Sequence, residues 1–354
     1  KKQLKITFKK YQLNLVKKIR SLRSNNPTNY WKLINGSKQE KNEMYNKITC
    51  EAFYEHFKNL GATEQDDAAT EGVNNDTNDE VTNELLDDLF TVKEVEEVLR
   101  TLKNNKACGI DLITNELLKA ASSELIQLIT LFFNIVLQSG KVPEEWSIGI
   151  IKPLYKQKGD KTNTNNYRGI SILSCFGKLF TCLINNRLCS YVKLYSLLGE
   201  EQAGFRSGYS VSDHIFTLHS LIEFFLSKKK RLYCVFIDYE KAFDLVDRAF
   251  LWQKLLDLKI NGKILRVIQV LYVKAKSQVQ WNNTLSDYFS CTSGVRQGEN
   301  LSPLLFALFL NDLKDFLDEK MVGLTSVRTE ALNLNMDEDY VDILYRMFML
   351  LYAD

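Results

Sequence analysis

Residues 232–244 read Leu232-Tyr-Cys-Val-Phe-Ile-Asp-Tyr-Glu-Lys-Ala-Phe-Asp244, an apolar run that ends on a carboxylate. The final five residues, Leu350-Leu-Tyr-Ala-Asp354, repeat that pattern. A run as short as 232–237 is typical of a buried β-strand rather than of a helix. An ionised carboxylate at the edge of such a run is costly unless something pairs with it. Two such strands side by side would bring Asp238 and Asp354 together, and a divalent cation between them would remove their repulsion.

Three further blocks accompany these carboxylates: Asn166-Tyr-Arg-Gly-Ile-Ser-Ile-Leu173, Gln202-Ala-Gly-Phe-Arg-Ser-Gly208 and Ser293-Gly-Val-Arg-Gln-Gly-Glu-Asn-Leu-Ser-Pro-Leu-Leu-Phe306. Together the blocks resemble the ordered motifs of reverse transcriptases, most closely those of non-LTR (LINE-type) retrotransposons. The resemblance runs from about residue 90 to residue 354. It implies an RNA-directed DNA polymerase that uses two Mg²⁺ ions, with Mn²⁺ as an alternative, to add nucleotides to a primer 3′-hydroxyl.

The resemblance also implies roles for individual residues. Asp238 matches the metal ligand of the family's Phe-x-Asp-x-x-x-Ala-Phe-Asp block, and Asp354 matches the first aspartate of its Tyr-x-Asp-Asp turn. Both are therefore expected to be catalytic. Phe243 matches the aromatic residue that lies under the incoming sugar and excludes a 2′-hydroxyl. Gln297 and Gly298 match the Gln-Gly pair that lies against the nascent base pair.

Cationic and aromatic residues complete the implied site. Arg168 and Lys152 match basic positions of a fingers hairpin, where they would hold the triphosphate, and the arginine fork suits phosphate geometry. Aromatic and arginine side chains are the usual means of holding a single-stranded template. The residues expected to contact the template are Gln202, Phe205, Arg206 and Arg296.

Taken without the resemblance, the same residues have structural interpretations. An aspartate after a strand is more often a turn or cap residue, and Phe243 would more often be a core residue. Glu240 and Asp244 are interpreted as surface partners of Lys241 or Arg248. The block at 293–306 is also consistent with a glycine-bounded loop that leads into a capped helix.

Composition limits the class of protein. Among the 354 residues, 45% are hydrophobic, which is ample for a packed core and excludes a mostly disordered chain. The net charge is only +2, but residues 1–38 hold eleven Lys or Arg and no acid, and residues 61–90 hold ten Asp or Glu and no base. Such a basic arm fits either a tail that meets phosphate or a solvated surface.

The seven cysteines include no Cys-x-x-Cys pair, so no zinc site is predicted.

Local patterns predict an α+β fold, because strands and helices mix without strict βαβ alternation. Helices are expected over 1–24, 42–60, 91–102, 115–138, 176–194, 211–227, 249–258, 262–274 and 303–316, and strands over 148–155, 170–173, 232–237, 279–281, 288–291 and 347–353. Three parts are predicted. Residues 1–60 are a basic helical N-terminal extension, and 61–90 are an acidic linker. Residues 91–354 are the helix-rich fingers and palm of a right-hand polymerase with an antiparallel palm sheet, as the resemblance implies.

The expected partners are an RNA template, a DNA primer or target and deoxynucleoside triphosphates, in the nucleus and cytoplasm, with no membrane. The motif at residue 354 lacks its second aspartate, and the thumb is missing, so we expect the chain alone to be inactive. A truncated remnant that acts at most as an RNA-binding module is the alternative. A group II intron-like maturase or an RNA-templated RNA polymerase would share the carboxylates.

Overall fold

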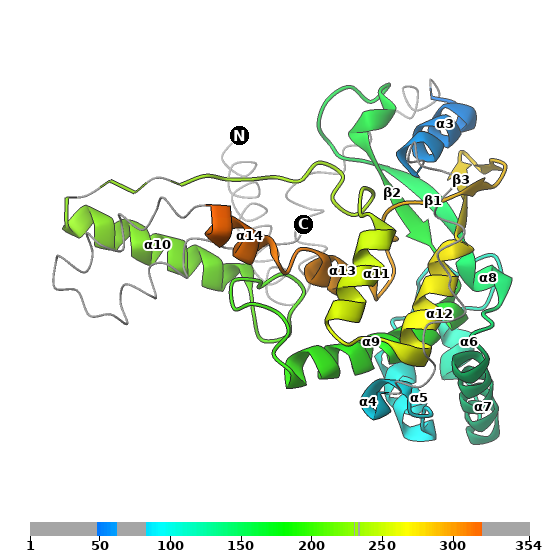
Figure 1. Ribbon diagram of the computed structural model, residues 1–354. Coiled ribbons are helices and arrows are strands. Elements are labelled where there is room, and N and C mark those ends of the chain that lie inside the picture. Colours follow the sequence, from blue (N-terminus) through cyan, green and yellow to red (C-terminus); the bar gives the residue numbers. More distant parts are fainter. Residues whose placement is uncertain (1–47, 62–82, 230, 233, 321–354) are drawn as a thin grey trace, which may run out of the picture. The chain divides into compact units, whose positions relative to one another are not determined.

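The computed structural model describes residues 48–61, 83–229, 231–232 and 234–320 (Figure 1). The chain divides into two compact units, one made of residues 1–48 and 160–162 and the other of residues 49–159 and 163–354. In the first unit, Thr162 donates hydrogen bonds from its amide and its hydroxyl to Asp160, at 2.9 and 2.7 Å. The helix predicted over 1–24 lies outside the described residues. All elements named below belong to the second unit.

Helix α3 (Cys50–Gly61) confirms the described part of the helix predicted over 42–60. Its apolar residues Phe53 and Phe57 are buried, one turn apart on one face of the helix. The Phe53 ring lies 4.9 Å from the ring of Tyr167 and 4.7 Å from that of Trp281, both in the sheet. Helix α3 therefore belongs to the packed body of the second unit.

The predicted acidic linker over 61–90 is wrong at its C-terminal end. Residues Glu84–Asp87 form the short helix α4, which Asn83 caps. Leu86 and Phe90 are buried, at 0% and 3% exposure. These two apolar side chains, four residues apart, fix the segment against the core although three of its residues, Glu84, Asp87 and Asp88, are acidic.

The helix expected over 91–102 is α5 (Val92–Thr101), which begins with a capping box between Thr91 and Glu94. The single helix expected over 115–138 is instead two helices, α6 (Asn115–Lys119) and α7 (Ser123–Ser139). Ser122 interrupts it because its side chain accepts a hydrogen bond from the amide of Leu125 and starts a new helix. Helix α7 ends at Gly140, where φ is +67°, and α8 (Glu144–Ser147) follows.

The sheet has the strand order β2-β1-β3-β4, and β5 also pairs with β3. Strand β1 (Ile148–Tyr155) pairs antiparallel with β2 (Tyr167–Ile172), after the short 3₁₀ helix η2 (Thr164–Asn166). Strand β3 (Lys276–Trp281) runs parallel to β1, and β4 (Thr284–Leu285) and β5 (Phe289–Ser290) pair antiparallel with β3. The sheet is therefore mixed, where an antiparallel sheet was predicted. A long helical crossover separates β1 from β3, and such a connection allows a parallel pair.

The remaining helices lie near their predicted positions. They are α9 (Cys175–Leu194), α10 (Val211–Ser227), α11 (Arg248–Asp257) and α12 (Gly262–Val273). The helix expected over 303–316 is divided into α13 (Ser302–Phe309) and α14 (Leu313–Lys320). The break contains Asn311, whose side chain bonds the carbonyl of Leu197 and the amide of Gly199, at 2.8 and 3.2 Å.

The core gathers around α9, which contacts α4, α5, α6 and α8 (Figure 1). Four aromatic rings form its centre, with centroids 5.1 to 5.9 Å apart: Phe133, Trp146, Phe176 and Phe180. None of the described helices has the length and apolar character needed to span a bilayer.

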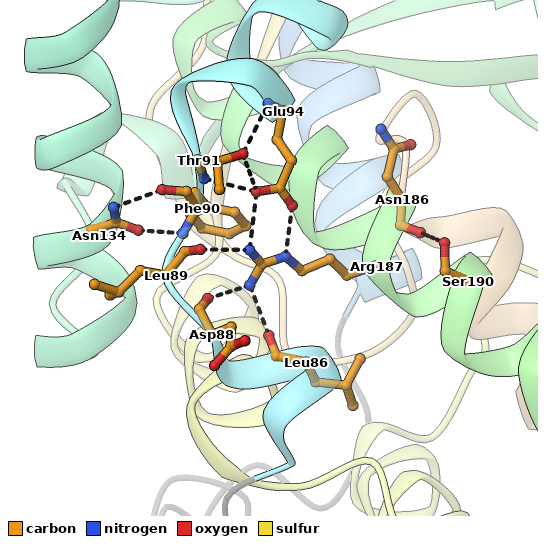
Figure 2. A network of polar contacts seen from close by, with 10 residues as sticks. All are labelled: Leu86, Asp88, Leu89, Phe90, Thr91, Glu94, Asn134, Asn186, Arg187 and Ser190. Atoms are coloured by element: carbon orange, nitrogen blue, oxygen red, sulfur yellow. Dashed lines mark hydrogen bonds and ion pairs between the residues drawn. The ribbon is translucent and has the colours of Figure 1, made fainter.

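Arg187 of α9 joins this core to the segment that leads from α4 into α5. Figure 2 shows its guanidinium between the Glu94 carboxylate, at 3.1 and 3.2 Å, and several backbone carbonyls. The carbonyls belong to Leu86, Asp88 and Leu89. One buried side chain thus satisfies acceptors that the turn between two helices leaves open.

Candidate functional site

Three of the sequence blocks meet at the segment that follows β5. The amide of Gly294 donates to the carbonyl of Val246 at 2.9 Å, and the amide of Val295 donates to that of Phe243 at 2.7 Å. On the other side, the amide of Ser171 in β2 donates to the carbonyl of Gln297 at 3.0 Å. Residues 294–297 therefore connect the turn after Asp238 to the hairpin that carries Arg168.

Gln297 and Asp244 form the polar centre of this junction. The Gln297 Nε2 atom lies 3.3 and 3.5 Å from the two carboxylate oxygens of Asp244. Both side chains line a cavity of about 70 Å³ together with Gly169 and Ser171 of β2. Burial raises the pKa of Asp244, and the positive charges of Lys241 and Lys156 act in the opposite direction.

The interpretation of Asp244 as a surface partner of Arg248 is wrong. The Arg248 guanidinium is largely buried and donates to the carbonyls of Tyr272, Cys291, Ser293 and Gly294, at 2.6 to 2.9 Å. Sequence reasoning missed the pairing of Asp244 with Gln297. The available signal was that Asp244 closes the same block as Asp238 and directly follows Phe243.

Phe243 is half-buried beside this polar pair. Its ring centroid lies 5.0 Å from that of Phe306 in α13 and 6.4 Å from that of Phe205. The ring thus has core contacts on one side and the exposed Phe205, at 55%, on the other. The structural and the functional interpretation of Phe243 are compatible, because the residue packs on α13 and borders the junction.

Gly298 has a φ of +108°, which side chains other than that of glycine rarely adopt. A Cβ atom there would lie 2.7 Å from the carbonyl oxygen of Ser171. The close backbone approach that this glycine allows is therefore to the backbone of β2. Glycine at 298 is thus needed for the junction itself.

The strand expected over 232–237 is absent from the described residues of that segment. Residues 234–239 have no regular structure, and Val235, Phe236 and Ile237 are 83%, 84% and 70% exposed. A strand requires a hydrogen-bonding neighbour, and no described strand pairs with this segment. Its predicted partner, 347–353, lies outside the described residues, as does Asp354.

Asp238 itself is exposed and has no hydrogen bond or ion pair with any described residue. Among those residues, no group of three or more His, Cys, Asp or Glu side chains could hold a metal ion. The convergence of Asp238 and Asp354 stays a prediction.

Lys152 and Arg168 lie on one face of the β1–β2 hairpin. The register pairs Lys152 with Ile170 and Leu154 with Arg168, so the two cations are diagonal neighbours on the same side. Leu154 and Ile170 on that face are 56% and 43% exposed, whereas Ile151 and Tyr167 on the opposite face are buried. The hairpin thus presents both cations to solvent, with no partner among the described residues.

The four residues predicted to contact template occupy different environments. Phe205 is exposed and has a φ of +57°. Gln202 is 1% exposed, and its Oε1 accepts from the amide of Gly204 at 3.0 Å. Arg206 donates to the carbonyls of Gly199 and Gln202, at 2.6 and 3.1 Å. In this arrangement only Phe205 has its side chain free for a template.

Arg296 also has a structural role instead of the predicted contact with template or phosphate. Its guanidinium donates to the carbonyls of Trp146, Ser147 and Leu271, at 2.7 to 3.0 Å. Nothing in the local sequence indicated this role, because an arginine between glycines is equally typical of a phosphate-binding loop.

Comparison with known proteins tests these assignments at the level of the family. The sequence profile of the family described as reverse transcriptase (RNA-dependent DNA polymerase) matches residues 156–354. A protein named as the probable RNA-directed DNA polymerase from transposon X-element of Drosophila melanogaster is 32% identical over 231 residues. That match covers 63% of this chain and 25% of the relative.

Two further relatives come from other mobile elements. The RNA-directed DNA polymerase from mobile element jockey of Drosophila melanogaster is 28% identical over 226 residues, 63% of this chain and 24% of the relative. The retrovirus-related Pol polyprotein from type-1 retrotransposable element R2 of Nasonia vitripennis is 27% identical over 215 residues, 61% of this chain and 20% of the relative. The chain thus spans a quarter or less of the length of these relatives. The profile covers more than half of the chain, and the chain belongs to the reverse transcriptase family of RNA-dependent DNA polymerases, with relatives in non-LTR retrotransposons.

Proposed function

We propose that this chain is the nucleotide-adding part of an RNA-directed DNA polymerase of a LINE-type retrotransposon. The β1–β2 hairpin would belong to its fingers, and residues 234–306 would contribute to its palm. The observation that carries the proposal is the junction at 294–297, where Gln297 bonds both Asp244 and the backbone of the hairpin. A nucleotide at this junction would meet the aromatic and amide groups expected of such a site, whereas the cations Lys152 and Arg168 lie on the other face of the hairpin.

The Asp238 carboxylate would serve as a metal ligand together with Asp354. An exposed carboxylate with no partner among the described residues is free to coordinate, and hard oxygen ligands suit magnesium. When bound, two Mg²⁺ ions, or Mn²⁺ in their place, lower the pKa of a primer 3′-hydroxyl and neutralise the triphosphate.

The chain's other residues would bind and orient the nucleotide. Phe243, fixed by Phe306, would lie against the sugar and exclude a 2′-hydroxyl. Gln297, fixed by Asp244, would face the nascent base pair. Lys152 and Arg168 would neutralise the triphosphate from the exposed face of the hairpin.

The partners proposed are an RNA template, a DNA primer or target and deoxynucleoside triphosphates. Phe205 would stack on a template base. The basic residues of 1–38 would contact nucleic acid phosphates. The nucleus and cytoplasm are the expected locations for an element that copies its RNA onto target DNA.

Primer extension on an RNA template with magnesium and deoxynucleotides tests the proposal. The assay should use both this chain and a polypeptide extended to the length of its relatives. Asp238→Asn should abolish product, and Glu240→Gln, an exposed carboxylate two residues away, is the matched control that should retain it. RNA binding without extension by either wild-type protein would instead support the inactive RNA-binding remnant.

A further inference from the structure

A small cavity lies between α8, α9 and α12, and Glu299, the residue after Gly298, forms part of its wall. Its volume is about 10 Å³, which is the space that one water molecule requires. Its apolar walls include Trp146, Leu173 and Leu271, and its charged walls are Glu299 and Lys178.

Glu299 is a buried carboxylate without a direct partner. The residue is 6% exposed, and its Oε2 atom is fully buried and makes no hydrogen bond with any described residue. A buried carboxylate without a hydrogen-bond donor would be strongly unfavourable. A further donor must therefore reach the Glu299 oxygen. The cavity that Glu299 lines is where such a group fits.

The cations around Glu299 differ in what they can offer. Arg248 interacts with the charge of Glu299, but its guanidinium is engaged by the carbonyls of Tyr272 and Cys291. The Arg296 guanidinium is likewise engaged by backbone carbonyls. Lys178, in the first turn of α9, makes no side-chain hydrogen bond or ion pair with any described residue. Burial lowers the pKa of Lys178, and the negative charge of Glu299 opposes that shift.

We propose that one water molecule in this cavity bridges the Glu299 carboxylate and the Lys178 ammonium. The bridge fixes the loop that carries Gln297 and Gly298 against α9. Glu299 follows Gly298 directly, and the carbonyl of Lys178 accepts a hydrogen bond from Asn300, at 3.4 Å. Glu299 and Lys178 are thus positioning residues for Gln297. Their link to nucleotide use rests on the function proposed above.

A double-mutant cycle tests the bridge without reference to polymerase activity. Glu299→Gln and Lys178→Met should each raise the unfolding equilibrium constant by about a hundredfold, because each leaves a buried charge without its partner. The unfolding equilibrium constant of the double variant Glu299→Gln/Lys178→Met should rise by far less than the product of the two single effects. Lys193→Met, on the exposed end of α9, is the control and should change little. Multiplicative single effects would overturn the proposal.

Two measurements test whether the water is present and whether the bridge holds the Gln297 loop in place. A high-resolution crystal structure of the wild-type chain should show a water molecule within hydrogen-bond distance of both groups, and an empty cavity would overturn the proposal even if every variant failed to fold. Hydrogen exchange of the Ser171 amide, which donates to the Gln297 carbonyl, should accelerate at least tenfold in Glu299→Gln and not in Lys193→Met. Unchanged exchange would remove the positioning role.

In the extended, polymerising protein, Glu299→Gln should raise KM for the deoxynucleotide severalfold with little change in kcat. A merely structural pair would lower the amount of folded enzyme and leave KM unchanged. If the wild type makes no product while the cycle and the exchange behave as stated, the proposed function fails and the bridge stands.

Discussion

At the scale of single residues, the junction shows how a polar pair can be held next to an aromatic ring. Asp244 is partly buried and lines the cavity, and its amide partner Gln297 is fixed by the backbone of β2. Phe243 is held by Phe306 from the core side. These contacts restrict the rotamers of the side chains that we propose to meet the nucleotide, and such restriction is what a selective site requires.

The sugar preference depends on Phe243. Phe243→Val should raise the incorporation of ribonucleotides relative to deoxynucleotides by about tenfold or more, because a smaller side chain leaves room for a hydroxyl. Single-nucleotide extension with each sugar measures the ratio. Phe243→Tyr keeps the ring and should keep the preference, and an equal ratio in Val and Tyr variants would contradict the role.

Asp244 should make stability depend on pH. Burial raises its pKa, so the folded chain binds this proton more tightly than the unfolded chain does. The resulting stabilisation is present below the unfolded pKa and is lost as the pH rises through the folded pKa. Asp244→Asn should therefore have a higher Tm than the wild type at pH 7, and the difference should shrink as the pH falls toward 4.

Thermal unfolding at several pH values measures this difference. Asp287→Asn, on an exposed turn, is the matched control and should show the same small Tm change at each pH. A gain for Asp244→Asn that grows toward acid pH would contradict the burial argument.

At the scale of elements, side chains that bond backbone groups decide where helices begin and end. Thr91 and Ser122 start α5 and α7, and Asn311 separates α13 from α14. Arg187 has a similar effect over a long distance in the sequence, because its guanidinium donates hydrogen bonds to the backbone carbonyls of the turn between α4 and α5 (Figure 2). Local capping is visible in a sequence, but a cap supplied from a hundred residues away is not.

Arg187→Met should destabilise the chain by about 3 kcal/mol, because it leaves the Glu94 charge and the carbonyls of buried Leu86 and of Asp88 and Leu89 without their donor. Arg100→Met breaks an Arg–Glu pair of the same type, but that arginine side chain is 77% exposed. This control should cost less than about 0.5 kcal/mol. Denaturant unfolding of both variants measures the difference, and equal losses would show that Arg187 contributes no more than a surface pair.

At the scale of the whole molecule, the sequence predicted local elements well and long-range pairings poorly. Helix α10 was predicted with its observed bounds, and the β1–β2 hairpin was predicted with a shorter second strand. The parallel pairing of β1 with β3 was missed, because periodicity reports which face of a strand is buried and not which strand lies beside it. The same limit explains Arg296, since its three acceptors come from distant parts of the chain.

The order of the motifs predicted which residues to consider for the candidate site. It did not predict the contacts that those residues make. Backbone hydrogen bonds link the blocks that contain Phe243, Gln297 and Arg168, and the roles that the resemblance implies for these residues stay predictions. The partners Asp244 and Ser171 and the buried state of Gln202 follow from packing, which no spacing rule encodes. Arginines bound by carbonyls and arginines free for phosphate look alike in a sequence.

RNA binding by the chain should weaken as salt rises, because cations on the hairpin would release counterions from phosphate. Replacing both Lys152 and Arg168 with Gln should reduce the slope of log K against log salt by about 1.4 on single-stranded RNA. Fluorescence anisotropy at several salt concentrations measures the slope. Lys93→Gln with Lys193→Gln, on exposed helix positions, removes the same charge and should leave the slope nearly unchanged.

The parallel pairing of Ile148–Ile151 with residues 276–279 has a consequence for biosynthesis. While the ribosome makes the intervening residues, the β1–β2 hairpin has emerged with one backbone edge still unpaired. Such an edge invites association between neighbouring nascent chains. Translation speed between these two strands, or a chaperone acting in that interval, should therefore govern how much protein escapes aggregation.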